Sequence, residues 1–118
     1  MEALAAAETL LVGFPDSAVS RAFYAAYHGV TAVFALQGRT FSKHAAVRSA
    51  LHRELVHSGQ WPEDLGRAYD LLMELRRSAD YGAVAPRGDA TPEDAIEAAR
   101  RIVRFVRRTY PQLSEEHA

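Results

Sequence analysis

Proline followed directly by acidic residues occurs three times in this sequence, at Pro15-Asp16, Pro62-Glu63-Asp64 and Pro92-Glu93-Asp94. The first turn of a helix tolerates proline because its missing N–H would have no partner there. Acidic side chains are favoured at the same place because the helix dipole is positive at that end. Each of the three stretches therefore predicts the start of a helix.

Glycine and proline also mark where the predicted helices end, as at Gly38, Gly59 and Pro111. No stretch shows the alternation of a strand. We predict five helices, at about residues 2–12, 15–37, 43–58, 62–81 and 92–110. Because short connections make neighbouring helices antiparallel, the expected fold class is all-α, an up-and-down antiparallel bundle of four long helices plus a short N-terminal helix.

Composition limits the class of protein. The 118 residues are expected to form one domain over residues 1–118, with a frayed tail at 113–118, and a hydrophobic content of 48% suffices for a core. The absence of cysteine excludes disulfides and thiolate chemistry and fits the cytoplasm, where we expect the protein. With a net charge of −1, any attraction to nucleic acid needs a local patch. No apolar run approaches the roughly 18 residues of a membrane-spanning helix, so we expect no membrane association.

The helix expected at 15–37 carries its polar side chains on one side. At about 100° per residue they share an arc of roughly 120°, while the rest of the circumference is apolar and predicts a central helix. The arc consists of Ser20, Arg21, Tyr24, Tyr27, His28 and Thr31. It can be a structural network in which Tyr24 and His28 find hydrogen-bond partners and Arg21 pairs with a carboxylate. It can also line a cleft where Arg21 binds an anion and His28 transfers a proton.

A second polar cluster ends the helix expected at 62–81. Spacings of four, three and four residues place one stripe on this helix, formed by Asp70, Glu74, Arg77 and Tyr81, with Asp80 beside it. An ion pair with an aromatic cap explains this pattern without any function. A binding site at the helix end is the other interpretation.

The two polar stretches read "SRAFYAAYH" at 20–28 and "RRSADY" at 76–81, and a turn with Gly38, Ser42 and His44 lies between them. In order and separation they resemble one branch of the HEPN family, a family of small helical bundles found in prokaryotes. The resemblance extends over nearly the whole chain. It implies the same helical fold that the helix starts and ends predict.

The resemblance also implies a function. Many HEPN proteins are metal-independent ribonucleases of toxin–antitoxin or defence systems, with a site in a cleft between two protomers and a small nucleotidyltransferase as their usual partner. Their hallmark is a late Arg followed after four to six residues by a His. Here Arg76 and Arg77 are followed by Asp80 and Tyr81 instead. We therefore expect a homodimeric toxin–antitoxin or nucleotidyltransferase-associated component that binds nucleotide, RNA or a partner protein without the ribonuclease motif.

Two sets of site residues follow. The expected binding residues are Ser20, Arg21, Tyr24, Arg76 and Asp80. The alternative is an active metal-independent endoribonuclease in which Arg77 works with His28 or Tyr81, since cleavage without a metal needs a base for the ribose hydroxyl and a cation for the phosphate.

The remaining candidate groups favour structural roles. His44, His52, His57 and His117 show no metal-ligand spacing, so we expect no metal and no cofactor. The five arginines of the last helix could bind phosphates. They also complement the negative end of the helix dipole, and Glu97 can pair with Arg101. Trp61 is expected to pack against a neighbouring helix.

Overall fold

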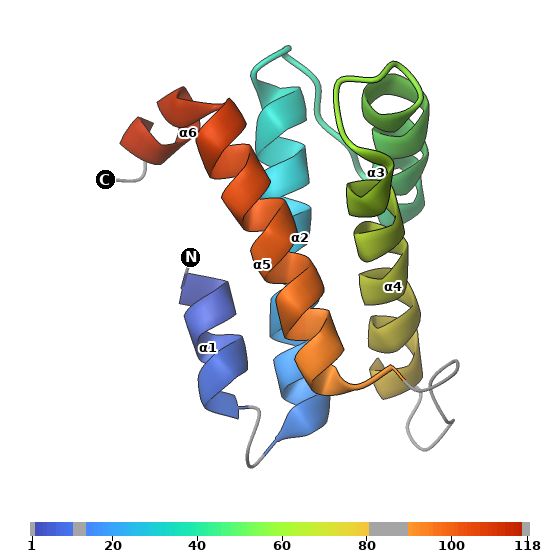
Figure 1. The fold of residues 1–118 in the computed structure, drawn as a ribbon, viewed down its shortest axis with the longest axis vertical. Coiled ribbons are helices and arrows are strands. Elements are labelled where there is room, and N and C mark those ends of the chain that lie inside the picture. The colour runs from blue at the N-terminus through green and yellow to red at the C-terminus, as the bar shows by residue number, and fades with distance from the viewer. Residues whose placement is uncertain (1, 11–13, 81–89, 117–118) are drawn as a thin grey trace.

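The computed structural model describes residues 2–10, 14–80 and 90–116, and this part of the chain is helical without strands. The elements are α1 (Glu2–Leu10), α2 (Pro15–Ala35), α3 (His44–Ala50), the π-helix η1 (Leu51–Val56), α4 (Glu63–Asp80), α5 (Pro92–Thr109) and α6 (Pro111–Glu116). The expected all-α bundle is confirmed. Its four long helical stretches are α2, α3 with η1, α4 and α5, and the short α1 packs against α2 and α5 (Figure 1).

The helix starts lie where the proline–acid stretches predict them. α2 begins at Pro15, α4 begins directly after Pro62, and α5 begins at Pro92. Thr91 forms a capping box with Asp94, because its hydroxyl accepts from the Asp94 N–H at 3.2 Å and its own N–H donates to the Asp94 carboxylate at 2.9 Å. Local sequence therefore determines where these helices begin.

The connection from α2 to α3 is held against the end of α2. Gly38 has a φ of 75°, the left-handed conformation that glycine adopts without strain at a helix end. The Phe34 and Phe41 rings lie 5.1 Å apart, and the Arg39 guanidinium lies over both of them at 5.1 and 5.2 Å. Arg39 also forms an ion pair with Glu54 of η1. These contacts fix the direction in which the chain leaves α2.

The chain then runs back along α2 before α3 begins. The His44 ring, at the start of α3, lies 4.6 Å from the Tyr27 ring in the middle of α2. The end of η1 lies near the end of α2, where Glu54 meets Arg39. α2 and α3 therefore run in the same direction (Figure 1), and the antiparallel arrangement expected for this pair is not formed. This return places His44 beside the polar arc of α2.

The core contains the apolar side of α2. Ala22, Phe23, Ala26 and Val30 have no exposed surface. Trp61 packs as the sequence predicts: it is 2% exposed, its ring lies 5.0 Å from Phe105, and its indole N–H donates to the Tyr110 hydroxyl at 3.0 Å. This contact joins the start of α4 to the end of α5.

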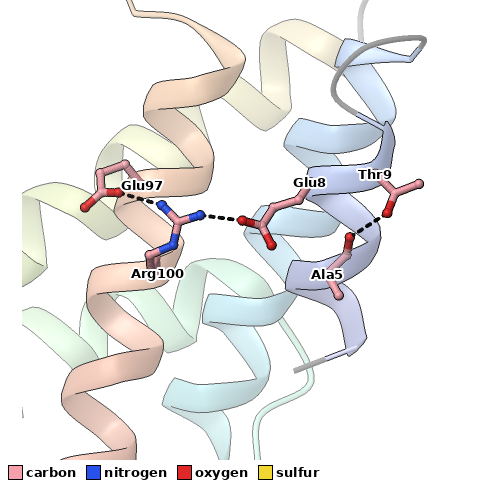
Figure 2. Close-up of polar contacts among 5 residues, drawn as sticks. All are labelled: Ala5, Glu8, Thr9, Glu97 and Arg100. Carbon is pink, nitrogen blue, oxygen red and sulfur yellow. Dashed lines mark hydrogen bonds and ion pairs between the residues drawn. The ribbon is translucent and has the colours of Figure 1, made fainter.

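α1 is attached to the rest of the bundle, chiefly to α2, mainly by apolar contacts. Leu4 and Ala7 are buried, at 6% and 0% exposed. Figure 2 shows the polar contact at the surface, where Arg100 donates to Glu8 at 2.5 Å and to Glu97 at 2.7 Å. Exposed ion pairs of this kind contribute about 0–1 kcal/mol. The buried apolar residues therefore account for most of the attachment.

The C-terminal segment includes the first residues of the tail expected to fray at 113–118. The structure continues from α5 into α6 as far as Glu116. Leu113 is 7% exposed, and its burial anchors this end of the chain against the core.

Candidate nucleic-acid interface

The polar arc of α2 lies at the surface of the protein. Arg21 and His28 are exposed, and Tyr24 and Tyr27 are half-buried. Arg21 forms no ion pair or hydrogen bond with the part of the chain that the structure describes. The expectation that Arg21 pairs with a carboxylate inside a structural network is therefore not met among these residues.

Arg76 of α4 reaches this arc. Its Nη2 donates to the Tyr24 hydroxyl at 3.1 Å, and its Nη1 lies 3.4 Å from Nδ1 of His44. The guanidinium carbon lies 5.0 Å from the centre of the Phe23 ring and 5.2 Å from that of Tyr24, within the range of cation–π attraction. Three helices thus contribute to one group of side chains. We call Tyr24, Tyr27, His44 and Arg76 the aromatic–arginine cluster.

His44 is a neutral imidazole in this cluster at neutral pH. Partial burial lowers the pKa of His44 below its ordinary value, and the neighbouring Arg76 guanidinium lowers it further. Because a guanidinium only donates hydrogen bonds, Nδ1 accepts from Arg76 and the ring proton is assigned to Nε2. Sequence reasoning did not select His44 as a site residue. The signal that could have found it is the Ser42–His44 turn shared with the HEPN branch.

The two adjacent arginines at the end of α4 differ in their surroundings. Arg76 is half-buried in the cluster, whereas Arg77 is exposed. No hydrogen bond or ion pair joins Arg77 to His28 or to any other described residue. Asp80 is the last residue of α4, and Tyr81 lies outside the described residues. The Arg77–His28 pair is therefore not joined by a hydrogen bond or ion pair, and the Arg77–Tyr81 pair includes a residue outside the described ranges.

A surface depression adjoins the cluster on the N-terminal side of Tyr24. Its volume is about 520 Å³, and it is lined by Phe14, Ser17, Ser20, Arg21 and Tyr24. Three of the residues predicted to bind a ligand, Ser20, Arg21 and Tyr24, thus surround one space. Tyr24 belongs to both features, so the depression and Arg76 are linked directly.

Asp70 takes part in a separate polar cluster further along α3 and η1, between them and α4. One of its carboxylate oxygens accepts from Nε of Arg48 and bonds Nε2 of His52, both at 2.8 Å. The His52 ring packs against Gly66, where an added Cβ would stand 2.9 Å from it. These contacts hold α3 and η1 against α4, so Asp70 has a structural role here instead of joining Arg77 in a site.

The arginines of α5 divide into two groups. Arg100 pairs with Glu97 and Glu8, and Arg101 pairs with Asp64, so the expected Glu97–Arg101 pair is not formed. The other three are exposed and have no ion pair within the described ranges; they are Arg104, Arg107 and Arg108. Among the described residues, none of these three arginines lies over an aromatic ring, as a base-stacking surface would need. Their position in the last turns of α5 fits the negative end of the dipole.

The described part of the chain shows neither a metal-binding group of side chains nor a membrane-spanning helix. Over residues 2–10, 14–80 and 90–116, no three His, Asp or Glu side chains are grouped so that they could hold a metal ion. Over the same ranges, no helix has the length and apolar character needed to cross a membrane.

Comparison with known proteins identifies relatives. The model of the HEPN domain family matches residues 2–109. Over 83 residues the chain is 36% identical to a UPF0332 protein of Thermotoga maritima, an alignment that covers 70% of this chain and 63% of that protein. The chain thus spans less than two thirds of that relative's length. No solved structure matches.

Proposed function

This chain belongs to the HEPN domain family, and we propose that it binds RNA or a nucleotide through the aromatic–arginine cluster. The observation that carries the proposal is the meeting of Arg76 with Tyr24 and His44 from two other helices at the surface of the bundle. A guanidinium beside half-buried tyrosine rings suits single-stranded nucleic acid, because the cation attracts phosphate and aromatic rings stack on bases of any sequence. The late Arg…His motif is not required for such binding.

Fluorescence anisotropy with a labelled single-stranded RNA tests the proposal. Arg76→Gln should weaken binding by about 10-fold or more, because a charge-assisted contact is worth about 1.5–3 kcal/mol. The matched control is Arg67→Gln, which removes an exposed arginine of the same helix that forms no hydrogen bond or ion pair with the described residues. It should change the affinity by less than about two-fold, the loss of a little long-range attraction. Equal effects of the two substitutions, or no binding by the unaltered protein, would contradict the proposal.

A second candidate function is metal-independent cleavage of RNA. The observation that favours it is the pairing of Arg76 with His44, a cation next to an imidazole in a chain whose late motif lacks its histidine. The sequence-based version uses Arg77 with His28 or Tyr81. Incubation with mixed RNA in EDTA separates these cases. Cleavage lost in His44→Asn would identify the Arg76–His44 pair, and cleavage lost only in the Arg77→Gln, His28→Asn variant would identify the other. Intact RNA would remove both.

We further propose, from family membership, that the protein is a cytoplasmic homodimer and that a nucleotidyltransferase encoded nearby is its partner in a toxin–antitoxin pair. Phe14 and Leu36 are 64% and 41% exposed, and apolar side chains of this size are favoured at interfaces. Light scattering tests the dimer, and co-purification with the neighbouring nucleotidyltransferase tests the partner. A one-chain mass and separate elution would reject both.

A further inference from the structure

The depression beside the cluster has an exposed aromatic wall. Phe14 directly precedes α2 and is 64% exposed, the larger of the two values among the exposed large apolar side chains of the described chain. Exposing a phenyl ring to water costs free energy that burial elsewhere would recover. A ring left at the edge of a depression is therefore available to cover the flat face of a ligand.

The polar groups of the depression are unused within the described chain. The Arg21 guanidinium forms no ion pair there, and the hydroxyls of Ser17 and Ser20 form no hydrogen bond with described residues. Ser20 and Arg21 lie one turn beyond Ser17 on α2, and all three line the depression, so a guanidinium and two hydroxyls lie along one wall. Tyr24 closes the depression on the side of Arg76, to which its hydroxyl is bonded.

We propose that this depression holds one nucleotide unit, with its base against Phe14 and its phosphate on Arg21. The inference rests on the proposed binding of RNA or nucleotide and names a second subsite for it. Aromatic rings stack on every base, and a guanidinium pairs with phosphate through two parallel hydrogen bonds. The serine hydroxyls can bond the ribose. A volume of about 520 Å³ lies within the roughly 300–1,000 Å³ of small-molecule sites.

The position of Tyr24 predicts the path of a longer RNA from the depression. Because Tyr24 lines the depression and also accepts from Arg76, a strand whose phosphate lies on Arg21 continues towards the Arg76 guanidinium. A single nucleotide fills the depression alone, whereas a longer RNA reaches both cations. Selectivity among bases is expected to be low, because stacking on Phe14 reads no hydrogen-bonding edge.

NMR titration of the full chain with three probes tests the inference, using adenosine monophosphate, uridine monophosphate and ribose 5-phosphate. Both nucleotides should bind roughly 5-fold to 100-fold more tightly than ribose 5-phosphate, the range that stacking of one base produces. Phe14→Ala should reduce the nucleotide affinities to that of ribose 5-phosphate, and Phe14→Tyr, which keeps the ring, should not. Arg21→Gln should weaken all three probes. Both side chains are exposed, so the variants are expected to fold, which circular dichroism checks.

The outcomes separate this inference from the proposed function. If Arg76→Gln weakens RNA binding but Phe14→Ala and Arg21→Gln leave it unchanged, the depression is rejected as a nucleotide subsite and the cluster is kept as the RNA site. If nucleotide binding depends on Phe14 but Arg76→Gln leaves the RNA affinity unchanged, the depression is supported as a nucleotide site and the cluster is rejected as the RNA site. Equal affinity for the nucleotides and ribose 5-phosphate would overturn the inference directly.

Discussion

The hydrogen bond between Arg76 and Tyr24 should contribute measurably to stability, and a double-mutant cycle can isolate it. The contact spans 3.1 Å between two half-buried side chains of different helices. A hydrogen bond to a charged group is worth about 1.5–3 kcal/mol, and partial exposure reduces this one to about 1 kcal/mol. Tyr24→Phe removes the hydroxyl alone and should cost that amount.

Arg76→Met should cost about 2 kcal/mol, because it also removes the guanidinium from the Phe23 and Tyr24 rings, and each such contact is worth about 0.5–1 kcal/mol near the surface. The two changes together should cost no more than Arg76→Met alone. The expected coupling energy is therefore about 1 kcal/mol, the hydrogen bond itself.

Urea unfolding of the four proteins, followed by circular dichroism, measures this coupling as a change in the free energy of unfolding at constant m-value. The matched control is a second cycle that combines Tyr27→Phe, instead of Tyr24→Phe, with Arg76→Met. The Tyr27 ring belongs to the same cluster, but its hydroxyl has no hydrogen bond with the described residues. This control cycle should give additive effects. A Tyr24–Arg76 coupling below about 0.3 kcal/mol, the limit of additivity, would show that the cluster is not assembled in the free protein.

Two further predictions concern the imidazole of His44 and the hydroxyl of Tyr69. Since the pKa of His44 is lower in the folded protein than in the unfolded chain, the unfolded chain takes up the proton first as pH falls. The favourable contribution of the neutral ring is therefore full above the ordinary histidine pKa and is lost below it. The free energy of unfolding should fall between about pH 7.5 and about pH 5, and His44→Gln should make this fall smaller. A fall of the same size in the variant would contradict the prediction. The hydroxyl of Tyr69 is buried without a hydrogen-bond partner among the described residues, and burial raises the pKa of this phenol. Tyr69→Phe should stabilise the protein by about 1 kcal/mol in urea unfolding, because it removes an unsatisfied polar group, and destabilisation would reveal a bound water or other partner.

The helix starts and ends could be predicted from sequence because their causes are local. The capping box of Thr91 and the left-handed Gly38 involve neighbours in the chain. Whether Arg76 or Arg77 joins the cluster has no such local cause. Consecutive residues point about 100° apart on a helix, and which of them meets α2 depends on how α4 is rotated in the packed bundle. The sequence therefore points to the dipeptide Arg76–Arg77, but it could not tell which of the two arginines would meet Tyr24 and His44.

The position of His44 depends on a connection and not on a helix pattern. If the chain had turned directly at the end of α2, α3 would begin beside Phe34, seven residues and about 10 Å further along α2 than Tyr27. No side chain could then bring His44 to Arg76. The segment instead runs back along α2, and Arg39 holds it there between the Phe34 and Phe41 rings and Glu54. The tertiary contacts of Arg39 are thus what allows a residue at the start of α3 to share a site with residues from α2 and α4.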